Sequence, residues 1–415
     1  MRTVQSLVVA LVVVCVSAPA WAYKWQISDD SYIGVGALIQ AQAQFTEDAA
    51  PSKDTWSKDL KDIWSKDLKD TWSKDFFLRR ARIMVFGQLN KYVSFFMETD
   101  TPNFGKNGNW DTNQFFIQDA YGTFKVVDEF MVDAGMILLP FTRHNLIGAT
   151  SLNALDYHGD LIKFPAGSTK LWRDAGVQFR GYIFNQKLQY RVGVFSGSQG
   201  VKVKDKDPTG KEVETGATNP SDYPRVTGHV RYNIIDTETD FFPKGIYFPK
   251  EPILSVGVGV DFVPDSVKTK AATFDAQNHV ATKPEFGHHL GVAGDVFLDY
   301  PIGDDHEVVF QGTFFFYRDG KKDDKLKTSG LGSLVEAGYR WRFIEPVISF
   351  DYFKSDADNS DLLGIRGGLN FWLLKHNASV KAEFGARKEE KPSDANKPSD
   401  AKFVKQATLQ AQVLF

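Results

Sequence analysis

Charged side chains recur at alternate positions inside otherwise apolar segments of this chain. Arg80 and Arg82 fall in one such segment, 77–89, and Arg340 and Arg342 fall in another. Successive side chains of a β-strand point to opposite faces, so each segment would carry these charges on one face only. Guanidinium groups gathered on one face can hold or steer anions in water.

The opposite faces of these segments are apolar enough to lie against lipid. A Lys or Arg that faces lipid at the bilayer midplane costs about 2–4 kcal/mol, so the charged faces are predicted to line water. Arg79 is an exception, because alternation puts it on the lipid face, near a strand end from which it can reach the surface. The candidates for a positive wall are Arg80, Arg82, Arg180, Arg191, Arg340 and Arg342, and those for an opposing acidic wall are Glu98, Asp100 and Asp119.

Separated positive and negative walls would create a transverse field in a pore, which favours small polar solutes over apolar ones. The alternative is that these charges pair across neighbouring strands and only stabilise the wall. The sequence leaves both interpretations open.

The sequence lacks motifs for enzymatic chemistry. Its eight histidines are scattered, and neither an HExxH nor a GxSxG spacing occurs. The segment around Asp356 and Asp358 faintly resembles a calcium loop, but Gly367 stands where that loop needs a glutamate. We therefore predict no catalytic residue, no cofactor and no metal site, and we do not expect an enzyme.

The carboxyl-terminal segment 403–415 shows the strictest alternation. One face carries Ala407, Leu409, Ala411, Val413 and Phe415, and the other face is polar except for Leu414. This is the pattern of a strand with lipid outside and water inside, and a terminal Phe resembles an outer-membrane insertion signal. Sixteen alternating segments can be counted along the chain. The sequence predicts an all-β fold, a transmembrane antiparallel β-barrel of about 16 strands.

Composition is compatible with a barrel in outer-membrane lipid. The mean hydropathy is −0.29, yet a strand needs only about 9–11 alternating residues to cross a bilayer. The net charge of −3 provides no basic field, so nucleic acid is not predicted as a partner.

The amino-terminal residues 1–22 have the pattern of a secretory signal peptide. Arg2 precedes an apolar core, and the segment Ala20-Trp21-Ala22 resembles a cleavage site. We predict a mature barrel over 23–415, exported to the bacterial outer membrane. Cys15 is the only cysteine, so the mature chain would contain none.

Short and long connections alternate between the predicted strands, as expected for periplasmic turns and external loops. The first long loop, 46–76, contains an eight-residue repeat, Thr55-Trp-Ser-Lys-Asp-Leu-Lys-Asp. It is either an amphipathic segment that contacts the rim, lipid or a partner, or a recently duplicated surface loop. The connection 234–253 is long but falls on the periplasmic side, and we interpret it only as a tolerated insertion.

Several short motifs resemble those of the phosphate-selective porin O/P family. They are Arg79 to Arg82, Val93 to Asp100, Asp119 to Tyr121, Gly135 to Phe141, Tyr190 to Gly197, Glu336 to Arg340 and Gly368 to Trp372. The resemblance implies a sixteen-stranded porin, usually a homotrimer, whose third loop, 142–173, folds into the lumen as a constriction. Arg143 and Lys163 would then act from that loop.

The chain departs from the family pattern where anions would be bound. Met136 and Leu138 stand where the family often has a polar and a basic residue, and Ser349 replaces an inward Arg. Phosphate specificity is therefore not carried over. We predict an outer-membrane porin for small hydrophilic solutes or ions, weakly anion-preferring. The alternative is a barrel that docks a surface partner through its Trp-rich first loop.

Overall fold

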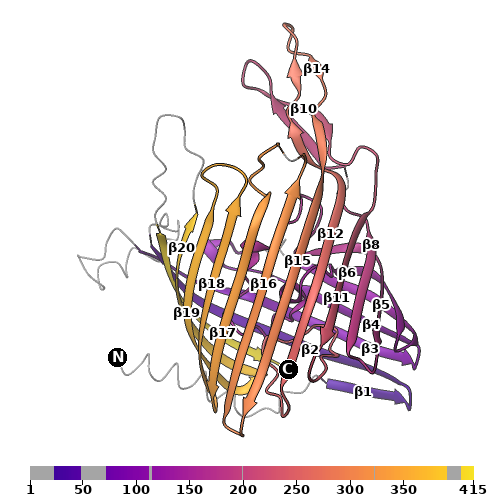
Figure 1. The fold of residues 1–415 in the computed structure, drawn as a ribbon, viewed down its shortest axis with the longest axis vertical. Coiled ribbons are helices and arrows are strands. Elements are labelled where there is room, and N and C mark those ends of the chain that lie inside the picture. The colour runs from indigo at the N-terminus through magenta and orange to yellow at the C-terminus, as the bar shows by residue number, and fades with distance from the viewer. Residues whose placement is uncertain (1–22, 48–71, 112–114, 199, 322, 390–402) are drawn as a thin grey trace.

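The computed structural model describes residues 23–47, 72–111, 115–198, 200–321, 323–389 and 403–415. Within these ranges the chain forms a closed antiparallel barrel of 16 strands, which confirms the predicted fold (Figure 1). The barrel strands are β2 (Ser31–Glu47), β3 (Trp72–Asn90), β4 (Val93–Asp100), β5 (Phe116–Val127), β6 (Phe130–Leu138), β7 (Arg173–Ile183), β8 (Leu188–Phe195), β11 (Arg225–Asn233), β12 (Ile253–Lys270), β15 (Glu285–Ile302), β16 (His306–Asp319), β17 (Gly330–Trp341), β18 (Ile344–Ser355), β19 (Leu362–His376), β20 (Ala378–Glu389) and β21 (Phe403–Leu414).

The barrel closes where its last strand meets its first. β21 pairs with β2 from Leu38↔Leu414 to Thr46↔Gln406, and the Ala37 amide donates to the Phe415 carbonyl at 2.6 Å. The additional strand β1 (Tyr23–Ser28), which the sequence did not predict, pairs with the part of β2 that β21 leaves free. No edge of β2 therefore stays open along this seam.

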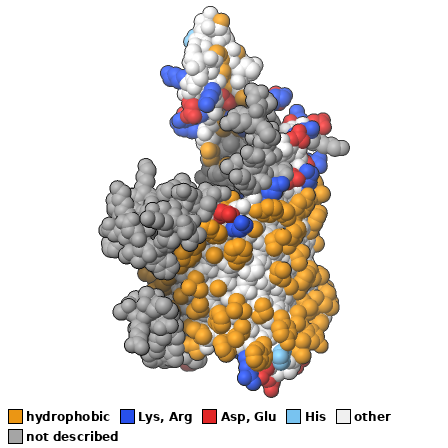
Figure 2. Space-filling model, turned by 90° about the vertical axis from the view of Figure 1, so that its left-hand side faces the viewer, with side chains coloured by type: hydrophobic (Ala, Val, Ile, Leu, Met, Phe, Trp, Pro, Cys, Tyr) orange, Lys and Arg blue, Asp and Glu red, His pale blue; other side chains and the backbone are white. Residues whose placement is uncertain are grey.

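The predicted alternation holds in the closing strand. The Leu409 side chain is 50% exposed on the outside, whereas Gln410 and Gln412 are buried on the inside. Apolar side chains cover the outer wall, and charged residues gather toward its two ends (Figure 2). This distribution suits a wall that faces lipid. In the described ranges no helix is long and apolar enough to cross a membrane.

Arg79 lies inside the barrel, contrary to the prediction that it faces lipid. The pairing of β2 with β3 shifts register between Gln40↔Arg80 and Ala41↔Leu78, so Arg79 is an extra residue in a β-bulge. A bulge redirects a side chain from the regular alternation. The Arg79 guanidinium consequently forms an ion pair with Asp156 at 2.5 Å.

The predicted first loop, 46–76, is shorter than expected, because β2 continues to Glu47 and β3 begins at Trp72. Most of its repeat, 48–71, lies outside the described residues, as does the predicted signal peptide, 1–22.

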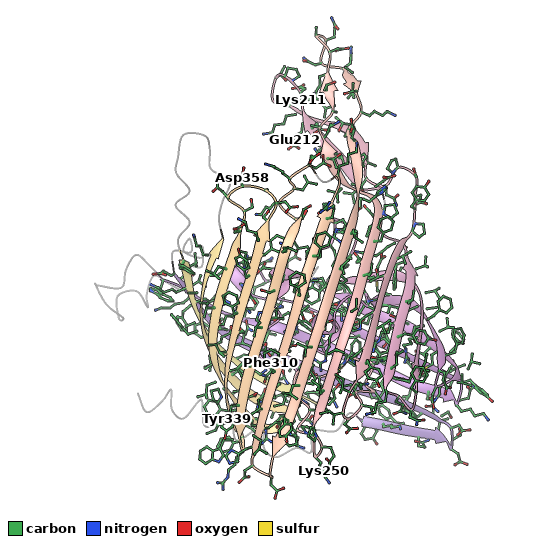
Figure 3. The ribbon with its side chains drawn as sticks, viewed as in Figure 1. Lys211, Glu212, Lys250, Phe310, Tyr339 and Asp358 are labelled. Carbon is green, nitrogen blue, oxygen red and sulfur yellow. The ribbon has the colours of Figure 1, made fainter. Side chains whose placement is uncertain are left out.

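Two hairpins extend beyond the barrel at the end opposite Lys250 (Figures 1 and 3). One is β9 (Lys202–Lys206) with β10 (Glu212–Ala217), and the other is β13 (Thr273–Phe274) with β14 (Val280–Thr282). Lys268, near the end of β12, forms an ion pair with Asp205 of the first hairpin at 2.7 Å. The two hairpins lie in the long connections between β8 and β11 and between β12 and β15.

Candidate functional site: the lumen and its inward segments

The segment 139–172, between β6 and β7, turns into the barrel and runs across its lumen. Its short helix α3 (Arg143–Leu146) begins with a capping box, in which Thr142 and Asn145 bond each other's backbone amides. The apolar residues Phe141, Leu146 and Leu161 of this segment are almost fully buried. The barrel's apolar core therefore lies inside the lumen, between this segment and the wall.

A glycine of β12 permits this segment to lie directly against the wall. A Cβ atom at Gly259 would stand 1.7 Å from the Phe141 carbonyl oxygen, a separation that no side chain tolerates. Gly291 of the neighbouring strand β15 similarly leaves space for the Phe141 ring. These inward glycines mark close backbone approach to the loop.

Polar side chains from the opposite wall hold the carbonyl groups of the segment. Lys381 donates to the Ala154 carbonyl at 3.0 Å, and Asn370 donates to the Asn153 carbonyl at 2.8 Å. Gln412 of the closing strand donates to the Thr150 carbonyl at 2.9 Å. The polar inner face of the last strands thus satisfies backbone acceptors that would otherwise be buried without partners.

Asp156 is an ionic anchor of the segment. Its carboxylate lies 2.5 Å from Arg79 and 2.8 Å from Arg80. Burial alone would raise the pKa of Asp156, but the two guanidinium groups outweigh burial and hold that pKa well below its usual range. The predicted wall residue Arg80 is therefore neutralised by the loop.

His158 is a second ionic anchor. Its ring lies 2.5 Å from Asp351 and 3.2 Å from Glu336, and all three side chains are buried. Burial alone would lower the pKa of His158, but the carboxylates outweigh burial and raise it to about 9. The neighbouring His144 has no such pair, so burial and the charge of His158 lower its pKa to about 4.

The predicted positive and acidic walls are not separate at Arg82. This side chain pairs with Glu98 at 2.8 Å and with Asp100 at 3.0 Å, both on the adjacent strand β4. The structure here favours the alternative interpretation, in which charges pair across neighbouring strands. Asp119 pairs with Arg173 at 2.9 Å rather than facing an empty lumen.

The remaining predicted cations divide into inward and outward positions. Arg180 pairs with Asp133 at 2.7 Å, and Arg340 pairs with Glu307. Arg342 lies outside the lumen, because β17 ends at Trp341 and the turn that follows exposes the Arg342 side chain. Two predicted cations lie on the inward segment.

Of these two, Arg143 is buried in an ion pair with Glu238 at 2.6 Å. The Lys163 ammonium lies 4.1 Å from the centre of the Phe353 ring.

Arg191 differs from the other predicted arginines because it forms no ion pair with a described residue. Only its Nη2 atom has partners, the carbonyls of Phe241 at 2.6 Å and Asp240 at 3.5 Å, whereas Nε and Nη1 are buried without partners. Arg231 Nε and Gln189 Nε2 are also unpartnered there, and Gln189 pairs with Arg231 in register. The wall formed by β7, β8 and β11 therefore has an excess of positive charge and hydrogen-bond donors.

A second segment, 234–252, enters the lumen from the side of the short turns. From the sequence this connection was interpreted only as a tolerated insertion, yet its residues Glu238 and Ile246 are fully buried. Phe241 stacks on Tyr121 at 5.0 Å, and Phe248 packs edge-on against Trp372 at 5.4 Å. Its run of aromatic and proline residues is unusually apolar for a solvated turn, and this signal could have identified it.

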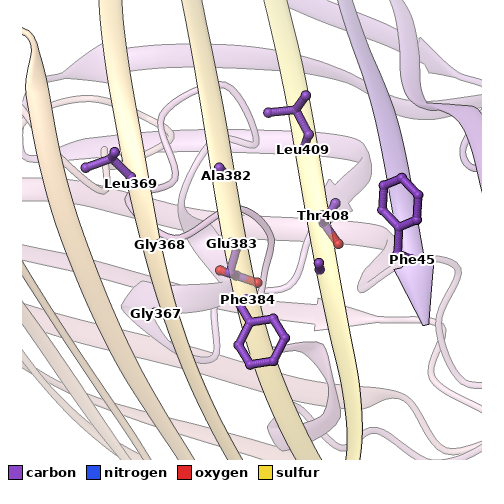
Figure 4. Close-up of a pocket in the computed structure, with 10 residues that line it drawn as sticks. Phe45, Gly367, Gly368, Leu369, Ala382, Glu383, Phe384, Thr408 and Leu409 are labelled. Atoms are coloured by element: carbon purple, nitrogen blue, oxygen red, sulfur yellow. The ribbon is translucent and has the colours of Figure 1, made fainter. Parts of the chain in front are cut away.

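The closing strands also form an apolar groove of about 450 Å³. Its lining includes Gly367, Leu369, Ala382, Phe384 and Leu409 (Figure 4). Leu369, Phe384 and Leu409 are exposed on the outer wall, so the groove faces lipid and lies off the lumen.

A closed sixteen-stranded barrel with an apolar outer wall, a charged interior and an inward loop defines a porin of the bacterial outer membrane. A family model described as phosphate-selective porin O and P matches residues 59–224. The family resemblance predicted from the sequence is thus confirmed over this part of the chain.

Solved structures agree on the fold. The loop-deleted OmpT of Vibrio cholerae aligns with a TM-score of 0.55 and 10% identity, over 93% of this chain and 100% of that one. OmpF of Salmonella typhi aligns with a TM-score of 0.55 and 14% identity, over 95% of this chain and 100% of that one. An anion-selective porin from Comamonas acidovorans aligns with a TM-score of 0.50 and 11% identity, over 93% and 100%. The comparison with curated protein sequences gave no match.

Proposed function

We propose that this porin is a passive channel for small hydrophilic solutes with a weak preference for anions. The observation that carries the proposed preference is Arg191, a buried guanidinium without a carboxylate partner among the described residues. A buried charge is poorly screened, so its field extends into the lumen and favours negative solutes. The match to an anion-transporting family supports the same direction.

The test is the reversal potential of the purified protein in a planar bilayer under a potassium chloride gradient. The wild type should conduct in steps and should favour chloride modestly. Arg191→Gln should move the reversal potential toward zero, whereas Arg342→Gln, which removes an exposed cation at a turn, should leave it unchanged. Equal potentials for Arg191→Gln and the wild type would exclude Arg191 as the source of selectivity.

We also propose that the protein assembles as a homotrimer, as the family resemblance implies. The groove around Gly367, Ala382 and Ala407 supplies small side chains, which allow two membrane-embedded walls to approach closely. Crosslinking in detergent followed by mass determination tests the stoichiometry. Ala407→Trp should reduce the trimer fraction if this wall is the contact.

A second candidate is a barrel that docks a surface partner through its first loop. The observation in its favour is the filling of the lumen, where Arg143, Arg191 and Arg231 are almost fully buried. Deletion of 52–74 separates the two functions, because a channel should still conduct after that deletion. Folded wild-type protein that never conducts would favour the docking function.

A further inference from the structure

The two inward segments, 139–172 and 234–252, are hydrogen-bonded to each other. The Gly148 amide donates to the Pro243 carbonyl at 3.1 Å, and the Gly245 amide donates to the Ser151 carbonyl at 2.9 Å. A Cβ atom at Gly245 would stand 2.5 Å from the Ser151 oxygen, so only glycine permits this approach. A loop from one end of the barrel is therefore bonded to a turn from the other end.

A buried ion pair stabilises the contact between the two inward segments. Glu238 of the segment 234–252 accepts from Arg143 at 2.6 Å, from Ser255 at 2.6 Å and from the Tyr247 hydroxyl at 2.9 Å. The Arg143 guanidinium also lies 3.4 Å from the centre of the Phe297 ring. Removing the Glu238 charge would leave Arg143 buried without its carboxylate, which favours withdrawal of the loop toward water.

Aromatic contacts fix the same segment to separate parts of the wall. Phe242 packs against Phe96 of β4 at 5.7 Å, and Phe248 contacts Trp372 of β19. Three prolines, Pro243, Pro249 and Pro252, limit the backbone freedom of the segment between these contacts. The segment is therefore a conformationally restricted element that crosses the lumen rather than a solvated turn.

We propose that the segment 234–252 is a latch that holds the inward loop 139–172 across the lumen and sets the width of the solute path. Its release point is the bond between Arg143 and Glu238. Breaking that bond allows the loop to withdraw and widens the path. The proposal rests on the proposed channel function and adds to it the element that controls permeation.

A reversible crosslink tests the latch within one protein. A Cβ atom at Gly148 would lie 3.5 Å from the Phe242 Cβ atom, within the range of about 3.5–4.5 Å found in disulfides. The variant carries Gly148→Cys, Phe242→Cys and Glu238→Gln, and the mature chain is predicted to contain no other thiol. Single-channel conductance is recorded before and after a reductant is added to the same bilayer.

With the disulfide closed, the variant should show the wild-type conductance. After reduction, the conductance should rise at least twofold or switch between several larger levels. Unchanged conductance on reduction would overturn the latch while leaving the channel function intact. Conductance that appears only after reduction would support a latch that closes the path completely.

Two controls complete the test. Asp236→Asn neutralises an exposed acid in the same segment and should leave conductance unchanged. The double cysteine variant with Glu238 retained should respond to reduction less than the triple variant. If neither the wild type nor the reduced triple variant conducts, although both are folded, the channel function and the latch both fail.

Discussion

Gly259→Ala should displace the inward loop without opening the barrel. The new Cβ atom would stand 1.7 Å from the Phe141 carbonyl oxygen, whereas ordinary contact begins at 3.4 Å. The Phe141 carbonyl must therefore move away by about 1.7 Å, the difference between these two distances. The strand β12 moves less easily, because it is hydrogen-bonded to a neighbouring strand on each side. Overpacking of this kind costs about 1–3 kcal/mol.

This displacement should spread to the charged part of the loop. Phe141 lies two residues before Arg143, whose amide donates to Asp295 at 2.9 Å. Losing a buried hydrogen bond to a charged acceptor costs about 1.5–3 kcal/mol more, enough to populate a withdrawn loop substantially. The barrel itself should remain, because its strand pairing is untouched.

The assay is single-channel conductance and reversal potential in a planar bilayer. Gly259→Ala should raise the mean conductance or increase the number of conductance levels. The matched control is Gly294→Ala on the adjacent strand β15, where an added Cβ atom meets nothing within 4 Å. If both variants conduct like the wild type, the inward loop does not limit permeation.

Three further perturbations test the loop anchors and the seam. The pKa of His158 is raised to about 9, so its charged contacts are fully present below about pH 6.5 and are lost as pH rises through 9. This loss lowers the free energy of unfolding by about 3 kcal/mol at most. Conductance should therefore change between pH 8 and pH 10 in the wild type and not in His158→Gln. Asp156→Asn should strengthen anion preference, read from the reversal potential, because Arg79 and Arg80 lose their shared carboxylate. Deletion of Phe415 should lower the folded fraction in heat-modifiability gels, since two backbone hydrogen bonds to β2 disappear.

The barrel could be predicted because a bilayer imposes a local rule on every strand. Each crossing must show an apolar face to lipid, so the sixteen alternating segments counted in the sequence equal the number of strands in the barrel. The rule failed where the backbone departs from regular pairing. Arg79 was misplaced because a bulge is one extra residue, and nothing in the alternation of neighbouring residues reveals it.

The partners of the lumen charges could not be predicted, because they depend on contacts between distant segments. His158 lies far in sequence from Glu336 and Asp351, and Arg143 lies 95 residues from Glu238. Alternation gives the face of a side chain but not the loop that will reach it. The sequence analysis therefore predicted several arginines whose side chains point inward, but it missed most of the acids that pair with them.

Ion selectivity in this lumen should depend on the few charged side chains that lack an ion-pair partner rather than on the total number of charges. A paired guanidinium presents a dipole to a passing ion, and its field decays faster than that of a lone charge. Arg80, Arg82 and Arg180 are all paired with carboxylates, so each should contribute less than Arg191. Replacing Glu98 with a basic residue should consequently alter ion selectivity in two ways. It reverses the charge at this position, and it leaves Arg82 without this carboxylate partner. A lumen that is rich in arginine can thus remain only weakly anion-preferring, and the two inward segments decide which of its charges a solute encounters.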